Sequence, residues 1–497
     1  MLDKTKANWK AVAADLDLEG RAFINGRYTE ALSGQRRATF NPANGEALVD
    51  VATCSPDDAD IAVKGARAAF ESGVWSGMAP AERKMVLVRW AELIEKNADE
   101  LALIECLDVG KPISDTVNVD VPSTVRTIRW SGEAIDKVYD EISPTPADCL
   151  ALVQRLPLGV VTAIVPWNFP LSTTAWKLAP ALATGNSVIL KPASNTPLSA
   201  IFIARLASEA GLPDGVLQVL PGPGGSLGKH LATHMDIDGL TFTGSTPVGK
   251  MLMEYSGQSN LKRTFLELGG KSPNIVFADA NLEKAAAMAA TAVFYNGGQT
   301  CTAGTRLIVE ESIRDEFLDL VVEQAKRWMP GDPLDPATRM GPMIDCAQYE
   351  TVAEYVGIGL NEGAELVFGG QRVLQESGGY YHEPSILSNV NNRMRVSQEE
   401  IFGPVLAVLT FTSAEEAVSI ANDSIYGLAG AVWSNNINTA LKVAAAVRVG
   451  TMGVNNYFGG DITVPFGGFK QSGNGRDKSI HAFHDYTELK TTWIEFE

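Results

Sequence analysis

The sequence predicts an α/β protein with two consecutive open sheets of parallel strands and a small additional β element. Short β-branched runs alternate with helical stretches beyond Gly159, and a second series of the same kind follows Gly270. Strand–helix alternation of this kind is typical of parallel sheets. The length of 497 residues also exceeds the size at which one hydrophobic core stops growing, so two or three domains are expected.

The elements are expected in the following order. Apolar residues recur at helical spacing from Ile61 to Leu107, so this N-terminal region is expected to be mainly helical. The first alternating unit has strands at Val160–Val165, Ser187–Leu190, Val216–Leu220 and Leu240–Thr243, with helices around Ala175–Ala183, Ile201–Ala210, Leu227–Ala232 and Val248–Tyr255. The second unit has strands at Asn274–Phe277, Leu307–Val309, Leu366–Phe368, Leu406–Phe411, Ala429–Trp433 and Met452–Val454, with helices such as Ile313–Trp328 and Asn438–Val447.

Two segments stand apart from both units. Polar and apolar residues alternate at Cys149–Arg155 and at Glu488–Glu497, as in half-buried strands. Open strand edges of this kind are often paired between subunits. We therefore expect a homo-oligomer, either a dimer or a tetramer.

Composition excludes several classes of function. The 59 acidic and 41 basic residues leave a net charge of −18, which disfavours nucleic acid or anionic lipid as a partner and favours small-molecule chemistry. The charged start at Met1–Lys6 does not resemble a signal peptide, and no later apolar run reaches membrane-spanning length, so a cytoplasmic protein is expected. Five scattered cysteines without a C-x-x-C pair fit neither a disulfide framework nor a zinc cluster.

One of these cysteines, Cys301, is a candidate nucleophile. A helical run from about Leu282 to Tyr295 stops at Gly297-Gly298, so Cys301 follows on irregular backbone, where reactive side chains are often displayed. The alternative is a buried cysteine in a glycine-rich turn. Because no histidine lies nearby in the sequence, a protease-like Cys–His pair is not favoured.

Two further polar residues are candidates for the same chemistry. Glu267 lies between two leucines at the end of an apolar strand, and apolar surroundings raise a carboxyl pKa toward the range of a general base. Asn168 follows the first parallel strand, where open α/β sheets place their ligand crevices, and its amide is a possible donor to an oxyanion. The alternatives are a solvated strand-end glutamate and a turn-capping asparagine.

These stretches together resemble the aldehyde dehydrogenase superfamily. Phe294–Thr305 is similar to its cysteine motif, Leu266–Pro273 to its glutamate motif and Pro166–Pro170 to its oxyanion segment. The resemblance continues through Phe242–Thr246, Glu399–Pro404 and Pro465–Lys470. A closer likeness, to the subgroup acting on γ-glutamyl-γ-aminobutyraldehyde and on guanidino- or aminobutyraldehydes, is carried by Asn455–Tyr457, Gly460–Pro465 and Gln471–Ser479.

The resemblance implies two Rossmann-like domains and a thioester mechanism. Residues 1–140 and 158–267 would form the NAD(P)-binding domain, 268–480 the catalytic domain, and 141–157 with 481–497 the oligomerisation strands. Cys301 would attack the aldehyde, and the Asn168 amide and the Cys301 N–H would hold the oxyanion. Hydride would pass to the nicotinamide, and Glu267 would activate the water that hydrolyses the thioester to an acid.

The resemblance also implies the cofactor site. A G-x-G-x-x-G after the first strand is absent, and the glycine-rich stretch Gly222–Gly228 occurs after the third strand instead. Gly244 and Ser245 would bring backbone N–H groups at a helix N-terminus to the pyrophosphate. The full expected set is Val165, Pro166, Trp167, Lys191, Ser194, Gly224, Gly228, Phe242, Gly244, Ser245, Leu268, Gln348, Glu400 and Phe402.

Two positions depart from the family pattern. Where many NAD-preferring relatives carry a glutamate that binds the ribose 2′-hydroxyl, this chain has Ser194. Since no carboxylate repels a 2′-phosphate there, we expect both NAD⁺ and NADP⁺ to be accepted. The second departure is Asp477, where many relatives have glutamate, and it puts a proton-relay role at that position in doubt.

The expected substrate site is a tunnel lined by Phe169, Trp176, Tyr295 and Phe466. Asp120 would lie near its mouth, either as an anchor for a cationic substrate tail, helped by Asp461, or simply as a residue capping a helix start before Pro122. The resemblance therefore predicts an ω-amino- or ω-guanidino-aldehyde of polyamine or arginine catabolism.

Other functions are weighed against this one. A broad-specificity or betaine-aldehyde-type enzyme is the nearest alternative, a CoA-acylating enzyme is disfavoured by Glu267, and a catalytically silent relative is disfavoured by the intact Cys301. His230 with His234, and His481 with His484, have helical spacing but no acidic third ligand in a metal-site pattern. No metal is therefore expected.

Overall fold

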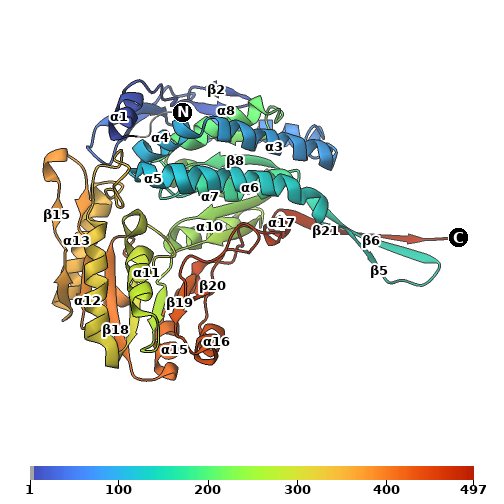
Figure 1. The fold of residues 1–497 in the computed structure, drawn as a ribbon. Helices are drawn as coiled ribbons and strands as arrows, with labels where there is room; N and C mark the ends of the chain where they lie inside the picture. The colour runs from blue at the N-terminus through green and yellow to red at the C-terminus, as the bar shows by residue number, and fades with distance from the viewer. Residues whose placement is uncertain (1–4) are drawn as a thin grey trace.

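The structure is a computed structural model that describes residues 5–497, and its two large sheets each contain seven strands (Figure 1). The first sheet has the order β11 (Arg263–Glu267), β10 (Gly239–Thr243), β7 (Val160–Ile164), β8 (Ser187–Lys191), β9 (Leu217–Val219), β1 (Ala22–Ile24) and β2 (Arg27–Thr29). The second has the order β14 (Glu365–Phe368), β17 (Ser385–Ser388), β18 (Val405–Phe411), β13 (Arg306–Glu310), β12 (Pro273–Val276), β19 (Ala429–Trp433) and β20 (Thr451–Val454). The α/β class with two sheets in succession is confirmed.

The first sheet is parallel from β11 to β9, and β1 and β2 add an antiparallel edge. Strands β7 and β8 are buried along their whole length, because helices cover both faces of the sheet. The helices of this half are α7 (Pro170–Ala183), α8 (Leu198–Glu209), α9 (Lys229–Thr233) and α10 (Thr246–Gln258). The helix predicted at Leu227–Ala232 is divided, since a π-helical turn, η3 (Gly224–Gly228), precedes α9.

The second sheet contains all six predicted strands, but one prediction about it was wrong. Strand β14 is not part of the parallel series, because it pairs antiparallel with β17, a short strand that the alternation pattern did not predict. The flanking helices are α11 (Leu282–Phe294), α12 (Arg314–Ala325), α13 (Cys346–Asn361), α14 (Arg395–Gln398), α15 (Ala414–Asn422) and α16 (Ile437–Ala446). Two smaller hairpins pair β3 (Arg36–Phe40) with β4 (Ala47–Ala52) and β15 (Arg372–Val373) with β16 (Tyr381–His382).

The N-terminal region is mainly helical, as predicted. It contains α1 (Lys6–Ala14), α2 (Pro56–Glu71), α3 (Pro80–Lys96), α4 (Ala98–Val109), α5 (Ile113–Asp115), the π-helical η1 (Thr116–Asp120) and α6 (Val121–Ala134). Ser55 begins α2 with a capping box in which its hydroxyl accepts from the Asp58 N–H and the Asp58 carboxylate accepts from the Ser55 N–H. Asp120, by contrast, lies inside continuous helix and makes no capping hydrogen bond, so the helix-cap interpretation of this residue was wrong.

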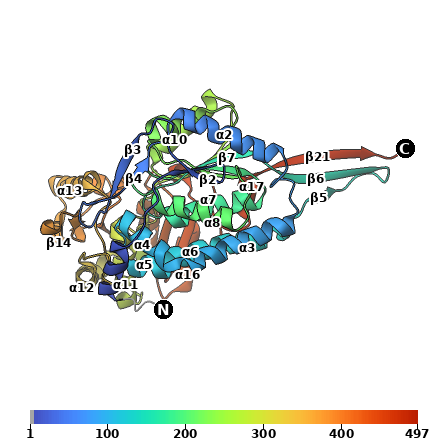
Figure 2. The same cartoon turned by 90° about the horizontal axis from the view of Figure 1, so that it is seen from above.

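The two segments with alternating polarity form one arm that projects from the body (Figures 1 and 2). Strand β6 (Cys149–Pro157) pairs antiparallel with β21 (Thr487–Glu495) on one side and with β5 (Glu141–Ser143) on the other. The first residues of the predicted 481–497 strand are instead helical, as α17 (His481–Asp485), because Phe483 packs edge-on against Trp130 in the core. Leu489 and Trp493 on the arm are more than half exposed.

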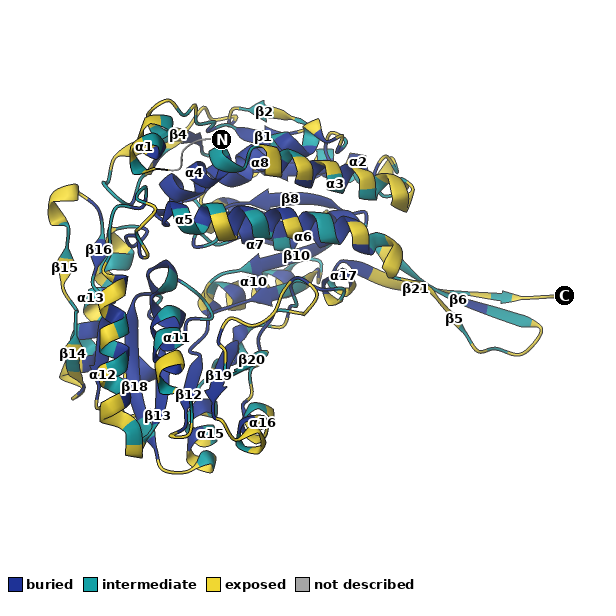
Figure 3. Ribbon diagram, viewed as in Figure 1, coloured by how far each residue is buried: buried dark blue, intermediate teal, exposed yellow. Residues whose placement is uncertain are grey.

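Burial follows the two sheets rather than the arm (Figure 3). The buried strands of both sheets lie under helices whose outer faces are exposed, while the arm strands are only partly buried. Over residues 5–497, no helix combines the length and the apolar character needed to cross a bilayer.

Candidate active site

One cavity of about 470 Å³ lies where the two sheets meet, and it joins most of the predicted site residues. From the predicted sets it is lined by Asp120, Pro166, Trp167, Asn168, Phe169, Trp176, Gly244, Ser245, Leu268, Tyr295, Cys301, Gln348, Glu400, Phe402 and Phe466. It is not lined by Val165, Lys191, Ser194, Gly224, Gly228, Phe242, Glu267 or Asp461. The cavity therefore connects the expected nicotinamide, thiol and substrate positions, while the expected adenosine-binding residues lie beyond it.

Cys301 is displayed on a loop whose backbone is held by side-chain amides. After α11 the chain takes left-handed conformations at Asn296 (φ 51°), Gly297 (φ 62°) and Gly298 (φ 71°). A side chain at Gly298 is excluded, because a Cβ there would lie 2.1 Å from the Gly403 carbonyl oxygen. The Gln299 side chain accepts from the Ile344 N–H and donates to the Asn296 carbonyl, which fixes the loop just before the cysteine.

The Cys301 thiol is protonated at neutral pH in this environment. Burial, followed by the nearby carboxyl groups of Glu400 and Glu267, raises its pKa to about 12. The Thr302 and Cys301 N–H groups act in the opposite direction, since they donate toward the sulfur. Because the thiolate is the nucleophile, the site needs a base or a bound cofactor to release the proton.

Asn168 lies within reach of the same loop. It follows β7 in the segment Val165–Phe169, and its Nδ2 donates to the Gln299 carbonyl at 2.8 Å. An amide nitrogen carries two hydrogens, so one donor remains available to an oxygen bound beside Cys301. The sequence analysis identified Asn168 but not Asn296 and Gln299, although amide side chains beside a glycine pair were a usable signal.

Glu267 is buried without a partner and does not line the cavity. It ends β11, where it forms a bridge with Gly473, and neither carboxyl oxygen has a hydrogen-bond partner among the described residues. Burial and then the nearby Asp477 carboxylate raise its pKa well above the ordinary range. One carboxyl oxygen lies 2.7 Å from the position of a Cβ at Gly467. The same carboxyl group is close enough to Cys301 to act on the pKa of its thiol.

Asp477, the position that departs from the family pattern, makes a buried ion pair. Its Oδ2 lies 2.7 Å from the Lys177 Nζ, and both side chains are at most 4% exposed. Although aspartate is shorter than the glutamate of many relatives, its carboxylate still reaches a lysine of α7. The sequence analysis did not single out Lys177.

The predicted phosphate-binding turn has the expected backbone geometry. A Cβ at Gly244 would lie 2.4 Å from the Phe242 Cζ, so only glycine fits there. Helix α10 begins after Ser245 without a side-chain cap, which leaves N–H groups free at its N-terminus. Free N–H groups at a helix N-terminus favour an anion. Both Gly244 and Ser245 line the cavity.

The expected adenosine-binding residues form a neighbouring group outside the cavity. The Lys191 Nζ donates to the Pro192 carbonyl at 2.8 Å, and burial lowers the pKa of Lys191 to about 8. A Cβ at Gly228 would be 3.6 Å from the Lys191 side chain, whereas a Cβ at Gly224 would meet nothing within 4 Å. The half-buried Ser194 donates its hydroxyl to the Gly222 carbonyl.

At the end of the cavity where the nicotinamide is expected, backbone groups contact Glu400 and Phe402. Glu400 Oε1 accepts from the Gly270 N–H at 3.0 Å, and burial raises the pKa of this carboxyl group to about 7. Phe402 has a left-handed backbone (φ 56°), and its ring meets Trp167 edge-on with centroids 5.2 Å apart. Gln348 donates to the Phe402 carbonyl at 2.9 Å and so supports this strained residue.

The substrate end is walled by aromatic rings. Phe169 stacks on Tyr295 with centroids 6.2 Å apart, and Trp176 lies against Phe466 with centroids 5.1 Å apart. All four rings line the cavity, as predicted. An aromatic wall of this kind suits the apolar chain of an aldehyde.

The charges at the substrate end differ from those expected. Asp120 lines the cavity, but its carboxylate is bound to the Lys111 Nζ at 2.9 Å, and both side chains are fully buried. Asp461 does not line the cavity, and its Oδ1 accepts from the N–H and the hydroxyl of Thr463. The sequence analysis missed Lys478, which lines the cavity beside Trp176.

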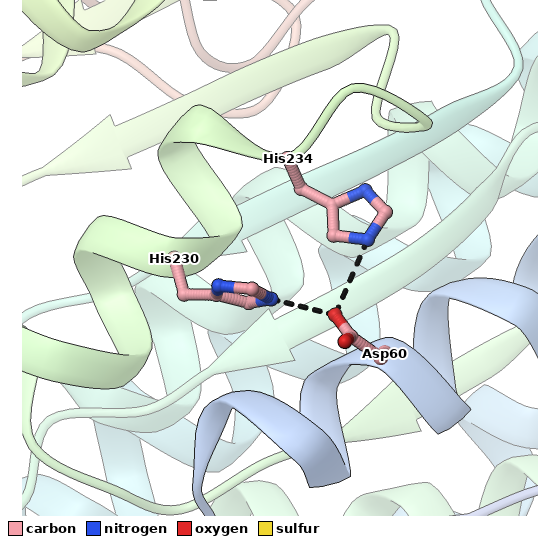
Figure 4. Close-up of side chains that lie close together, drawn as sticks. All are labelled: Asp60, His230 and His234. Atoms are coloured by element: carbon pink, nitrogen blue, oxygen red, sulfur yellow. Dashed lines mark hydrogen bonds and ion pairs between the residues drawn. The ribbon is translucent and has the colours of Figure 1, made fainter.

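The structure corrects one premise about the histidines. His230 and His234 have an acidic neighbour after all, because Asp60 of α2 lies between them (Figure 4). Its Oδ1 is 2.6 Å from His230 Nε2 and 3.4 Å from His234 Nε2. The spacing of the histidines alone could not reveal this, since α2 is far away in sequence.

This group is satisfied by hydrogen bonds as it stands. His234 Nδ1 accepts from the Asp236 N–H at 3.0 Å, which places the proton of the neutral ring on Nε2, facing Asp60. Burial lowers the pKa of His234 and favours this neutral form. A metal bound through Nε2 would force the proton onto Nδ1, directly against the Asp236 N–H. These contacts therefore do not favour a metal.

Comparison with known proteins agrees with this geometry. The chain is 52% identical over 492 residues to the NADP/NAD-dependent aldehyde dehydrogenase PuuC of Escherichia coli, with 99% of each chain covered. It matches the structure of the P. syringae indole-3-acetaldehyde dehydrogenase AldA in complex with NAD⁺ and IAA (TM-score 0.98, 59% identity, 99% and 100% covered). It also matches a γ-glutamyl-γ-aminobutyraldehyde dehydrogenase from Burkholderia cenocepacia (TM-score 0.98, 52% identity, 99% and 100% covered).

The family assignment follows from the extent of the match. The model of the aldehyde dehydrogenase family covers residues 28–492, which include every predicted site residue. The expected cysteine, asparagine and nicotinamide-side residues line one cavity within that span. The chain therefore belongs to the aldehyde dehydrogenase family and is an NAD(P)-dependent aldehyde dehydrogenase.

Proposed function

We propose that this enzyme oxidises an ω-amino- or ω-guanidino-aldehyde to the corresponding carboxylic acid in polyamine or arginine catabolism, with either NAD⁺ or NADP⁺ as the hydride acceptor. The observation that carries the proposal is that Cys301, Asn168 and an aromatic substrate wall line the same cavity as the cofactor-side residues Glu400 and Phe402. No metal is part of this proposal.

The first half of the reaction takes place at the Cys301 loop. After deprotonation, the thiolate adds to the aldehyde carbon, and the free hydrogen of the Asn168 amide and the Cys301 N–H stabilise the resulting oxyanion. Loss of the thiol proton is the demanding step, because burial holds the pKa of Cys301 near 12. A bound nicotinamide would supply the acceptor for the hydride that leaves the thiohemiacetal carbon, so that a thioester remains on Cys301.

The second half is hydrolysis, in which Glu267 acts as the base. Its carboxylate, buried beside Gly467, takes a proton from the attacking water. Attack by hydroxide on the thioester carbon then releases the acid and returns the thiolate. Burial raises the pKa of Glu267, and a raised pKa makes its carboxylate a stronger base toward the attacking water.

The chain's own residues fit a dinucleotide. Gly244 and Ser245 would receive the pyrophosphate at the uncapped N-terminus of α10, and Glu400 would bind ribose hydroxyls while Phe402 supports the ring. The open space at Gly224 and the ammonium of Lys191 suit the adenosine half. Because Ser194 carries no charge, a 2′-phosphate meets no carboxylate at that position, and we infer that both cofactors bind.

The substrate class is supported by where the subgroup motifs lie. Tyr457, Gly460, Pro465 and Lys478, all from these motifs, line the substrate end of the cavity. The 52%-identical solved relative carries the name of an aminoaldehyde enzyme in this subgroup. A cationic tail bound by Asp120 is less well supported, since Lys111 already neutralises that carboxylate.

An aldehyde panel with both cofactors tests the proposal. We expect kcat/KM for γ-glutamyl-γ-aminobutyraldehyde and 4-guanidinobutyraldehyde to exceed that for propanal at least tenfold, with acid formed in the absence of CoA. Propanal turned over as well as 4-guanidinobutyraldehyde would overturn the substrate class, and so would indole-3-acetaldehyde as the best member. A cofactor preference above about a thousandfold, roughly 4 kcal/mol, would overturn dual use.

Three further assignments belong to the proposal. Residues 1–140 with 158–267 form the cofactor domain, and 268–480 form the catalytic domain. The exposed apolar side chains of the β5–β6–β21 arm, such as Leu489 and Trp493, support a homo-oligomer that covers the arm. We expect a dimer or tetramer in the cytoplasm, and a chain that sediments as a monomer would contradict this assembly.

A further inference from the structure

A lysine ammonium lies inside the substrate end of the cavity. The Lys478 Nζ is 4.6 Å from the centroid of the Trp176 ring and 5.6 Å from that of Phe466, and all three residues line the cavity. An ammonium over an aromatic face is attracted by the ring. The two rings therefore hold the lysine head at the wall of the space in which the aldehyde chain would lie.

The backbone fixes this lysine in place. Lys478 and Ser479 both have left-handed backbone conformations (φ 61° and φ 52°), which residues other than glycine rarely adopt. The preceding Asp477 exchanges two backbone hydrogen bonds with Phe466, and the Ser479 N–H donates to the Ile462 carbonyl. Strain of this kind persists only where the surroundings enforce it, and it is frequent at ligand sites.

The Lys478 ammonium has no acceptor in the protein. Within residues 5–497 its Nζ forms no hydrogen bond or ion pair, whereas the buried Lys111 and Lys177 are each paired with a carboxylate. An ammonium has three donors, and in a partly dehydrated cavity it gains most from an anionic acceptor. The Lys478 ammonium is therefore free to bind an acceptor on a ligand.

The carboxylates near this end of the cavity are already engaged. Asp120 is bound to Lys111 and Asp477 to Lys177, while Asp461 accepts from Thr463 at the surface. The Asp477 and Asp461 carboxylates and the Arg126 guanidinium all act on Lys478, so this lysine is flanked by charges of both signs. Although the whole chain carries a charge of −18, the Asp120 and Asp477 carboxylates that line the cavity are each paired with a lysine, and the unpaired charge that lines the cavity at this end is the Lys478 ammonium.

We propose that Lys478 forms an anion subsite that binds a carboxylate at the end of the substrate remote from the aldehyde. The inference rests on the proposed function and deepens it: within the aminoaldehyde class, it favours chains that end in an amino-acid carboxylate over chains that end in a free guanidinium. A cationic tail would compete with Lys478 for the faces of Trp176 and Phe466 and would be repelled by it.

Two aldehydes that differ only in charge test the subsite. These are 6-oxohexanoate and its neutral methyl ester, compared as the ratio of their kcat/KM values in the full-length enzyme with NAD⁺. We expect the acid to be preferred by about tenfold to a hundredfold in the wild type, as for a charge-assisted hydrogen bond. The preference should disappear in Lys478→Met and persist in Lys478→Arg. Lys442→Met, an exposed lysine on α16, is the matched control and should keep the wild-type ratio.

The ratio cancels any general loss of activity in a variant. A wild-type preference for the ester, or an unchanged ratio in Lys478→Met, would overturn the subsite. If Lys478→Met does not fold, Lys478→Gln and the wild-type ratio still decide the question. In the same variant, turnover of 4-guanidinobutyraldehyde relative to the ester should rise, and a fall would overturn the proposed repulsion.

The two probes keep this test separate from that of the proposed function. Neither 6-oxohexanoate nor its ester carries an amine or a guanidine, so the charge preference is measurable even when the aminoaldehyde panel fails. Conversely, preferred turnover of aminoaldehydes together with an unchanged ratio in Lys478→Met would reject the subsite and leave the proposed function intact.

Discussion

Buried acidic groups have different partners at the two ends of the active site. Near the thiol, both oxygens of Glu267 lack partners, and burial raises the pKa values of Glu267 and Cys301. At the substrate end, Asp120 is bound to Lys111 at 2.9 Å with neither side chain exposed. Glu267 and Cys301 are therefore groups that can exchange protons, whereas Asp120 and Lys111 form a fixed pair of charges.

Because of this difference, we expect the thiol end of the site to be reactive and the substrate end to be rigid. An unpaired carboxyl group in an apolar site favours its protonated form, so its pKa lies above the ordinary value and it can exchange a proton during the reaction. A buried ion pair instead holds its two elements together, and removing one partner leaves an uncompensated charge. The thiol end should therefore respond to substitution mainly in rate, and the substrate end mainly in stability.

The largest effect is expected for Cys301→Ser. A serine hydroxyl is a far weaker nucleophile than a thiolate, so kcat/KM should fall on the order of 10⁴-fold, about 5.5 kcal/mol, with little change in stability. Initial rates of reduced-cofactor formation measure the loss, and thermal unfolding checks the fold. Cys149→Ser, at a half-exposed cysteine of the arm, is the control and should retain full activity. Activity of Cys301→Ser within tenfold of wild type would disprove the thioester scheme.

The second effect is expected in stability. Lys111→Met leaves the Asp120 carboxylate buried and unpaired, which should lower the free energy of unfolding by about 3–5 kcal/mol. The double variant Lys111→Met/Asp120→Asn should recover most of this loss, because no charge is then stranded. Urea unfolding midpoints measure both changes.

An exposed ion pair is the control for this experiment. Lys326→Met, which breaks the exposed pair of Lys326 with Glu323, should cost less than about 1 kcal/mol. Equal losses at the buried and exposed lysines would remove the distinction drawn between the two ends of the cavity.

The fold and the position of Cys301 and Asn168 beside one cavity were predictable from sequence because their signals are local. Strand–helix alternation predicted both sheets, which the structure contains. The motifs around Cys301 and Asn168 predicted a shared site, and both residues line one cavity. The pairings of Asp120 with Lys111 and of Asp60 with His230 were not predictable, since each depends on how helices pack. The alternation pattern could not identify β17, because its partner β14 runs antiparallel to it outside the repeat.

The third prediction concerns Glu267→Gln at the thiol end. An amide cannot accept the proton of water, so kcat should fall about a hundredfold while the first turnover persists as a burst of reduced cofactor. In the wild type, kcat should decrease as the pH falls through the raised pKa of Glu267, since only the carboxylate acts as base. A steady rate without a burst in the variant would contradict the assignment.

The same variant should change stability with the opposite sign to Lys111→Met. A carboxyl group whose pKa is raised in the folded state binds more protons folded than unfolded, so stability is lost as the pH rises above the unfolded value of 4.5. Glutamine cannot ionise, and Glu267→Gln should become the more stable protein toward alkaline pH, by about 1.4 kcal/mol for each unit of the shift. An unfolding midpoint that falls below wild type at high pH would contradict an unpaired Glu267.

The smallest effect is expected for Ser194→Glu, which adds a charge beside the cofactor instead of removing one. Because Ser194 is only half-buried, the new carboxylate remains hydrated, and stability should change by less than about 0.5 kcal/mol. Its charge should nevertheless repel a 2′-phosphate and lower kcat/KM for NADP⁺ relative to NAD⁺ about tenfold. Ser194→Gln has the same length without the charge, so an equal change of the cofactor ratio in both variants would assign the effect to size. A change confined to Ser194→Glu would show that charge at this end of the molecule selects a ligand, whereas the buried charge of Asp120 holds the structure together.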